Sequence, residues 1–247
     1  MSIPATLQSL SGSGLLAALP LAEQERLLPE LHCVTLALGE RIYESSGALD
    51  YMYFPTSCIV SLVYTMESGV TAEMGLVGKE GAVGLALFMG GETVPNRAVV
   101  QLGGKAIRMR AKALQEEFKR GGALQRGLLR YTQALITQIS QTAVCNRLHS
   151  VEQRLCRWLL LCHDRAESSE LRMTHEFIAD MLGGRRQSIT IAAGRLQSAG
   201  LIHYSRGNIT ILDRQGLEAI TCECSRVVKA EFNRLLGAQT KGASAGS

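Results

Sequence analysis

One stretch of the chain concentrates side chains that bind nucleic acid. Between Asp180 and Asp213 no residue is acidic, although the whole chain carries a net charge of only +4. Arginine pairs with guanine or phosphate, glutamine pairs with adenine, and serine and threonine bond to either. A stretch that carries positive charges but no negative ones, together with such side chains, predicts contact with DNA. The residues expected to make that contact are Thr174, Arg185, Arg186, Gln187, Ser188, Thr190, Arg195 and Arg206.

Two short helices and a hairpin are predicted to position these side chains. Thr174 precedes apolar residues at helical spacing, and the glycines at 183–184 favour a tight turn after the first helix. A second helix is expected over 186–199, followed by strands over 201–204 and 209–211. The alternative is an ordinary helical hairpin with a solvated arginine face. The acid-free stretch and the following hairpin favour a winged helix-turn-helix, whose second helix enters the major groove of DNA.

The segment THEFIADMLGGRRQSITIAAGRLQSAGLI, residues 174–202, resembles the C-terminal domain of the Crp/Fnr family of bacterial transcription regulators. The resemblance extends more loosely over residues 15–217. It implies an α+β chain with a jelly-roll-like N-terminal β-roll, a long dimerisation helix and a C-terminal winged helix-turn-helix domain. The corresponding ranges are 1–120 for the cyclic-nucleotide-binding-like β-roll, 121–149 for the dimerisation helix, 150–236 for the DNA-binding domain and 237–247 for a disordered tail.

The resemblance also assigns base and phosphate contacts to the start of the second helix. By position these contacts fall on Arg186, Gln187 and Thr190, while Ile191 stands where many members have arginine. An aliphatic side chain cannot hydrogen-bond to guanine and can touch only a thymine methyl group or the groove wall. We therefore expect a sequence-specific DNA-binding transcription regulator whose operator differs from that of the best-known members.

Length and composition bound the remaining possibilities. A chain of 247 residues suggests two domains. It has no run of about 18 apolar residues and no signal peptide at its N-terminus, so we expect a cytoplasmic protein without membrane contact. No histidine lies between Cys33 and Leu148, which argues against a metal-dependent β-barrel enzyme. Residues 150–247 hold 13 basic and 10 acidic side chains, so most of the net positive charge belongs to the C-terminal part.

The first half of the chain is expected to form the β-roll. Glycines recur every third residue from Gly75 to Gly84 and mark turns rather than a collagen repeat. A helix is predicted over 15–31. Short, evenly spaced strands are typical of a barrel or jelly roll. The predicted strands are 34–38, 51–54, 59–64 and 98–102.

Residues 78–85 resemble the phosphate-binding cassette of nucleotide-binding family members but lack its key side chains. In those members a Gly-Glu pair holds the ribose, and an arginine followed by serine or threonine holds the cyclic phosphate. Here Leu85 follows Gly84, and the second pair reads Asn96-Arg97. A shift by one residue along a strand turns a side chain to the other face. We therefore expect no control by a cyclic nucleotide. Gly84, Leu85, Asn96 and Arg97 would instead line a pocket for another effector. The alternative is a β-roll that binds no ligand and serves only as a packed domain.

Residues 121–149 contain no proline and few helix breakers, which predicts one long helix. Its apolar residues recur three or four positions apart, as along a coiled-coil seam. A DNA reader with one recognition helix gains affinity and palindrome specificity from two-fold symmetry, so we interpret the seam as a homodimer interface. The alternative is burial of the same residues against the chain's own β-roll. The expected interface residues are Leu128, Tyr131, Leu135, Ile139 and Thr142.

The chain has seven cysteines, and an odd number in a cytosolic protein argues against a disulfide framework. Cys222 and Cys224 form a C-x-C pair that is too sparse for a closed metal site unless other ligands converge on it. We therefore expect buried, inert thiols, with no metal ion and no cofactor. Metal or redox sensing is the alternative.

The resemblance implies four partners: double-stranded DNA, a second copy of the chain, RNA polymerase and an unidentified small-molecule effector. It implies no enzymatic activity. The alternative function is a small-molecule or redox sensor that acts mainly through protein contacts. Selection of duplexes from a random library discriminates the two, because a sensor of that kind would enrich no sequence above non-specific affinity.

Overall fold

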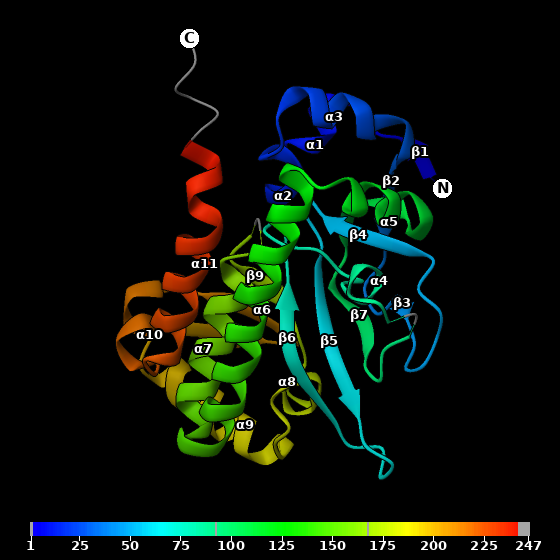
Figure 1. Cartoon of the computed structure of the whole chain (residues 1–247). Helices are drawn as coiled ribbons and strands as arrows, with labels where there is room; N and C mark the ends of the chain where they lie inside the picture. The colour runs from blue at the N-terminus through cyan, green and yellow to red at the C-terminus, as the bar shows by residue number, and fades with distance from the viewer. Residues whose placement is uncertain (1, 92, 167, 242–247) are drawn as a thin grey trace.

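The structure of the chain, a computed structural model, describes residues 2–91, 93–166 and 168–241. A β-roll, one long helix and a helical C-terminal domain with a small sheet follow one another along the chain (Figure 1). The expected α+β class and the order of the three parts are therefore confirmed. Within the described residues, every helix is too short or too polar to cross a membrane.

Two antiparallel sheets build the β-roll within the described part of residues 2–110. Their strand orders are β1-β2-β8-β4 and β3-β7-β5-β6. The expected strands β2, β4, β5 and β7 are confirmed with small shifts at their ends, whereas β1, β3, β6 and β8 were not predicted. The strands are β1 (Ser2–Pro4), β2 (Leu31–Leu36), β3 (Arg41–Tyr43), β4 (Tyr51–Pro55), β5 (Ile59–Thr65), β6 (Thr71–Val77), β7 (Arg97–Leu102) and β8 (Gly104–Arg110).

Short helices close the roll before the chain enters the long helix α6. The single helix expected over 15–31 is wrong. Pro20 is the N-cap of a new helix and Pro29 is the second residue of a 3-10 turn that begins at Leu28, so the segment breaks twice. The helices of this part are α1 (Leu7–Leu10), α2 (Gly14–Ala17), α3 (Leu21–Leu27), η1 (Leu28–Glu30), α4 (Ala86–Met89), α5 (Ala111–Arg120) and α6 (Ala123–Leu148).

Within the described residues, the C-terminal domain holds four helices around a three-stranded sheet, and a fifth helix returns along α6. The sheet has the order β10-β11-β9, and β9 was not predicted. The elements are α7 (Val151–His163), β9 (Glu170–Arg172), α8 (His175–Leu182), α9 (Arg186–Ser198), β10 (Ile202–Ser205), β11 (Asn208–Ile211), α10 (Arg214–Ile220) and α11 (Cys224–Lys241).

Helix α11 runs beside α6 in the opposite direction (Figure 1). The ring of Phe232 on α11 meets the ring of Tyr131 on α6 edge-on, with centroids 6.4 Å apart. The disordered tail expected over 237–247 is therefore wrong for residues 237–241, which continue α11. Residues 242–247 lie outside the described residues.

The predicted dimer seam on α6 proves to be an intramolecular contact. Leu128, Tyr131 and Leu135 are buried in the core that α6 shares with the β-roll, and Ile139 packs against the same core. Thr142 is half-buried, and its hydroxyl donates to the backbone carbonyl of Gln138. The assignment of Leu128, Tyr131 and Leu135 to a dimer interface is corrected, because they have almost no surface left for a partner. For the half-buried Ile139 and Thr142 it stays a prediction.

The β-roll and the C-terminal domain pack directly against each other along β5. Val60 and Leu62 point into the roll, whereas Ile59 and Val63 join the core of the C-terminal domain together with Trp158 of α7. Successive residues of a strand face opposite sides. The first five residues of β5 are therefore buried from both sides, and all of them except Ser61 are apolar.

Candidate nucleic-acid interface

Local sequence signals begin and end α8, the first helix of the interface. Thr174 is its N-cap, and the Oγ1 atom of Thr174 accepts a hydrogen bond from the backbone N–H of Phe177 at 3.1 Å. Gly183 ends the helix in the left-handed conformation, with φ 59°. Helix α9 begins at Arg186, so the turn is as short as a helix-turn-helix requires.

Helix α9 buries one face and exposes the other. Ile189, Ala192, Ala193 and Leu196 pack into the domain core, as predicted. The side chain of Ile191 is 51 % exposed and lies among polar neighbours. An exposed aliphatic group there suits a thymine methyl group or the groove wall. Ser188 is half-buried, and the exposed residues around it are Arg185, Arg186, Gln187, Thr190 and Arg195.

His175 joins the three elements of the interface. Its Nδ1 atom lies 3.0 Å from Thr190 Oγ1 on α9, and its ring stacks on Tyr204 of the wing with centroids 3.9 Å apart. Burial lowers the pKa of His175, and the nearby positive charge of Arg186 lowers it further. Gln197 adds a second tie, since its Oε1 accepts from the Tyr204 backbone N–H at 2.7 Å. The wing is thereby held against the recognition helix.

The wing is the hairpin of β10 and β11. Arg206 and Gly207 form its tip, both with positive φ, 47° and 81°. Such angles are those of a two-residue hairpin turn and are uncommon for a residue other than glycine. The short strand β9 adds Arg172 beside Asn208 at the edge of this sheet. Sequence reasoning missed Arg172 because a three-residue strand gives no periodic signal.

The arginines of this surface form only loose ion pairs. Arg186 lies 4.0 Å from Glu176 and Arg195 lies 3.4 Å from Glu152, and in both pairs the arginine is largely exposed. Exposed pairs of this kind contribute about 1 kcal/mol at most. DNA phosphates can therefore compete for both guanidinium groups.

The expected effector pocket of the β-roll lacks the fork of donors that a phosphate needs. Asn96 donates from Nδ2 to the hydroxyl of Tyr43 at 3.2 Å. Ala98 and Val100 are buried in the roll, so Arg97, which alternates with them on β7, lies on the outer face. Its Nε atom has no hydrogen-bond partner among the described residues. Gly84 has φ 106° and is followed by Leu85, the N-cap of α4.

A buried polar network connects the β-roll to α7. Trp158 donates from Nε1 to Glu73 Oε1 at 2.9 Å, and Ser61 Oγ lies 2.7 Å from Glu73 Oε2. The same hydroxyl of Ser61 lies 2.5 Å from Gln101 Oε1, and Gln101 in turn donates to Cys162 Sγ at 3.1 Å. One hydroxyl carries one proton, so with Gln101 Oε1 facing Ser61 both bonds of Ser61 form together when Glu73 is protonated and donates to it. In this orientation of the Gln101 amide the network favours a neutral Glu73.

We expect the contact between β-roll and α7 to weaken as pH rises. Burial raises the pKa of Glu73 from 4.5 to about 7, against hydrogen bonds from Ser61 and Trp158 that lower it. The stability that a neutral Glu73 provides is complete below pH 4.5 and is lost as pH rises through about 7. The loss is on the order of 3 kcal/mol. Trp158 is the only tryptophan of the sequence, so its fluorescence between pH 5 and pH 9 should report a transition.

Glu73→Gln supplies the control for this transition, since glutamine mimics the neutral carboxyl group. Its fluorescence should stay flat over the same pH range while the fold is kept. A transition that persists in Glu73→Gln would assign the pH dependence to another group, such as a histidine.

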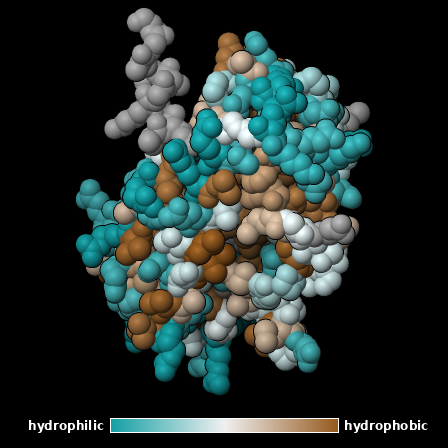
Figure 2. Space-filling model, viewed as in Figure 1, coloured by the Kyte–Doolittle hydropathy of each residue, from teal (hydrophilic) through white to brown (hydrophobic). Residues whose placement is uncertain are grey.

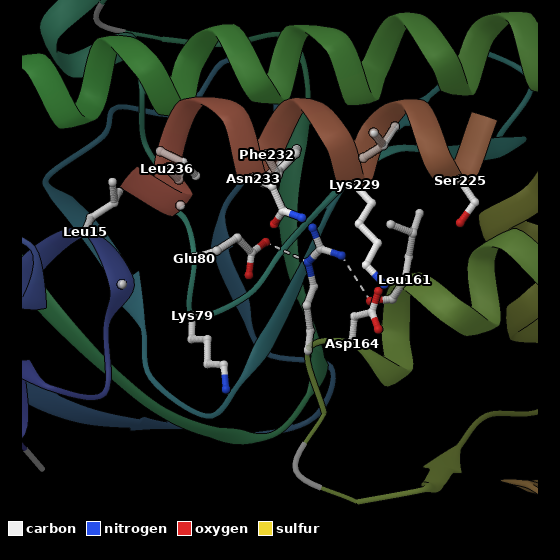
Figure 3. Close-up of a pocket in the computed structure, with 14 residues that line it drawn as sticks. Leu15, Lys79, Glu80, Leu161, Asp164, Ser225, Lys229, Phe232, Asn233 and Leu236 are labelled. Atoms are coloured by element: carbon white, nitrogen blue, oxygen red, sulfur yellow. Dashed lines mark hydrogen bonds and ion pairs between the residues drawn. The ribbon is translucent and has the colours of Figure 1, made fainter. Parts of the chain in front are cut away.

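A cavity of about 430 Å³ lies where the β-roll, the end of α7 and α11 meet. Figure 3 shows Lys229 reaching from α11 toward Asp164, with Asn233 opposite Glu80. The Arg165 guanidinium, which is buried, donates to Glu80 Oε1 at 2.7 Å, and the two charges neutralise each other. The remaining lining combines apolar side chains with mixed charges.

Comparison with known proteins shows two similarities. Residues 153–220 match the family described as the Crp-like helix-turn-helix domain. No curated protein matches the chain in sequence. Among solved structures, the chain is similar to FixK2 from Bradyrhizobium japonicum, with 16% identity and a TM-score of 0.66 over 77% of this chain and 96% of that chain.

Two further solved structures have the same arrangement. A Crp/Fnr-family protein from Eubacterium rectale is 19% identical, with a TM-score of 0.65 over 85% of this chain and 98% of that chain. A CRP-family transcriptional regulator from Thermus thermophilus is 20% identical, with a TM-score of 0.63 over 76% of this chain and 95% of that chain. At these identities the likeness establishes the fold.

Proposed function

We propose that the chain is a homodimeric transcription regulator of the Crp/Fnr type that reads a specific DNA sequence through α9. The match of residues 153–220 to the Crp-like helix-turn-helix domain and the fold shared with the solved structures support this proposal. The exposed polar face of α9 carries this proposal. It presents Arg186, Gln187 and Thr190 together, and the sequence has no acidic residue between Asp180 and Asp213. Glu176 of α8 makes only a loose pair with Arg186, at 4.0 Å. Selection of bound duplexes from a random pool tests the proposal, because only a sequence-specific reader enriches a motif.

The residues that would touch DNA divide into three groups. Arg186, Gln187 and Thr190 would read base edges in the major groove. Arg185, Arg195 and the wing-tip Arg206 would contact phosphates, which fix the position of the protein on the duplex. Thr174 and Ser188 lie at the ends of their helices, where a hydroxyl can also bond to phosphate. The proposal adds Arg172 to the phosphate contacts, since it is exposed beside the wing.

A second copy of the chain would bind along the exposed face of α6. Leu129 and Ile136 are seven residues apart, and their side chains are 51 % and 56 % exposed. Val144, also exposed, lies about two helical turns after Ile136. These three positions lie on one side of a helix with 3.6 residues per turn. Figure 2 shows this side of the molecule, with hydrophobic side chains between polar ones over α6. A parallel pair of α6 helices would place two α9 helices for two half-sites.

Control by an effector would pass through the joint between the β-roll and α7. The Glu73 network and the Arg165–Glu80 ion pair both cross this joint. The cavity beside Lys229 touches the β-roll, α7 and α11 at once, so a small molecule held there would shift their arrangement. RNA polymerase would be the partner of the DNA-bound protein. A transcription regulator works on DNA in the cytoplasm of a bacterium and catalyses no reaction, so we infer a cytoplasmic location and no enzymatic activity.

Cyclic AMP and cyclic GMP are expected not to bind. A cyclic phosphate carries a negative charge, and burying it without a paired cation is costly. Arg97 lies on the outer face of β7, and the Leu85 side chain cannot accept a hydrogen bond from a ribose hydroxyl group. Isothermal calorimetry with either nucleotide should show no heat of binding. Micromolar affinity that is lost in Arg97→Ala would overturn this and make the chain a nucleotide sensor.

A further inference from the structure

Three buried cysteines and one histidine come together where α6 ends. Cys145 lies in the last turn of α6, and His149 is the C-cap of that helix. Cys222 and Cys224 lie between α10 and the start of α11. One donor atom from each of the four residues lies within 4.8 Å of all the others. The three cysteines form a separate buried cluster, each at most 3 % exposed.

Two distances within this cluster match those between ligands of a tetrahedral metal ion. The Sγ atoms of Cys145 and Cys222 are 3.5 Å apart, and Cys224 Sγ is 3.7 Å from His149 Nδ1. Zinc bound at about 2.3 Å to sulfur and about 2.0 Å to nitrogen separates its ligand atoms by about 3.5 to 3.8 Å. Four donor atoms within 4.8 Å of one another are enough for one tetrahedral ion. Three cysteines and one histidine are also a common ligand set of structural zinc.

A carboxylate orients the histidine of the cluster. His149 Nε2 lies 3.4 Å from Glu223 Oε2, so the Nε2–H group can donate to that carboxylate. The imidazole then keeps its lone pair on Nδ1, which is the atom next to Cys224. The far ring N–H of a metal-bound histidine almost always donates to a carboxylate, a backbone carbonyl or a water molecule. His149 is therefore arranged as a metal ligand, and Glu223 holds its ring in place.

A buried cation, Arg157, lies close enough to the cluster to interact electrostatically with Cys145 and Cys224. Arg157 is 4 % exposed, and no carboxylate of the described residues lies within salt-bridge distance of it. One of its nitrogens donates to Thr142 at 2.8 Å, and its Nε atom has no partner among the described residues. A divalent ion with three thiolates has a net charge of −1. A guanidinium left unpaired in the same interior fits that charge.

We propose that Cys145, His149, Cys222 and Cys224 bind one zinc ion. The sequence alone left the pair at 222 and 224 without further ligands, and the fold supplies them from the end of α6. The ion would tie the end of α6 to the connection between α10 and α11, across the junction at His149 and Ser150 where α7 begins. It would thereby fix how the DNA-binding domain is set on the dimer helix.

A disulfide is the competing reading of the same thiols. Cys145 and Cys222 would have to approach from 3.5 Å to about 2.05 Å and lose two electrons to an oxidant. That bond would leave Cys224, His149 and Glu223 without a role. The metal site uses all of them.

The experiment measures metals in the untagged full-length protein, purified in reducing buffer without chelators after growth with added zinc. Mass spectrometry of metals should find about one zinc ion per chain. Cys222→Ser and Cys224→Ser should each lose most of it. Cys58→Ser removes a buried thiol outside the cluster and should retain full zinc content. Glu223→Gln, at an exposed position, should weaken zinc binding by about ten- to a hundredfold in competition with a chelator.

Cobalt provides a second readout that does not depend on variant stability. The metal-free wild-type protein titrated with Co²⁺ should show the visible absorption of tetrahedral cobalt and the near-ultraviolet bands of cobalt–thiolate bonds. A wild-type protein that holds no zinc and gives neither absorption would overturn the proposal. Full zinc retention in both serine variants, or an intact disulfide between Cys145 and Cys222 in the reduced preparation, would overturn it as well.

Discussion

Leu129→Asp combined with Ile136→Asp is expected to convert the protein into a monomer. Both side chains are more than half exposed on α6, so the change should leave the fold of the single chain intact. In a dimer that pairs these faces, an unpaired carboxylate in an apolar contact costs several kcal/mol. A loss of about 4 kcal/mol raises the dimer dissociation constant roughly a thousandfold. Analytical ultracentrifugation should show the change, and operator affinity should fall with it because one half-site contact is lost.

A matched control separates this effect from added charge. Leu21→Asp with Met66→Asp introduces the same charges at exposed apolar positions of the β-roll and should leave the dimer unchanged. An intact dimer in the Leu129 and Ile136 double variant would move the interface away from this face of α6. Leu135→Asp should behave differently from both, since Leu135 is buried in the roll and its change should unfold the chain.

Arg186→Ala is expected to weaken binding to the selected operator by about 1–3 kcal/mol, provided its guanidinium pairs with a guanine. That range corresponds to roughly a fivefold to more than a hundredfold rise in dissociation constant. Fluorescence anisotropy with the operator and with duplexes changed at single positions should show the loss concentrated at one base pair. Arg41→Ala, an exposed arginine of the β-roll, is the control and should bind as the wild type.

The pattern of loss in Arg186→Ala also distinguishes the two roles of an arginine on DNA. An equal fall on every duplex would make Arg186 a phosphate contact. No fall on any duplex would remove α9 as the recognition helix.

The DNA-binding domain was largely predictable because its signals are local. The cap at Thr174, the glycine at 183 and the hairpin turn at 205–208 each act within a few residues, and the structure has all three. The recognition helix buries the predicted face for the same reason. Three-residue strands such as β9 lack enough positions to show a period, so the edge of the wing was missed.

Long-range contacts were harder to predict. An apolar seam on α6 has the same spacing whether it packs on a second helix or on the chain's own sheet, so the sequence could not choose between them. Strand β6 was missed because Glu73 and Gly75 interrupt its apolar pattern. A Cβ atom at Gly75 would lie 3.1 Å from Gln138 and 3.3 Å from Leu135, so this residue serves the contact with α6. The four residues of the cysteine–histidine cluster are about 75 positions apart in two pairs, and only the fold joins them.

Selection of duplexes from a random-sequence pool by the full-length wild-type protein tests the central claim most directly. Sequencing of the bound fraction over successive rounds should show one enriched motif, an inverted repeat whose half-site centres lie about one helical turn, 10 base pairs, apart or a multiple of it. The half-sites should include a guanine that Arg186→Ala no longer selects and a thymine where Ile191 can contact the methyl group. Enrichment of no sequence above the starting pool, with binding that depends only on salt, would contradict the account and favour a sensor that acts through protein contacts.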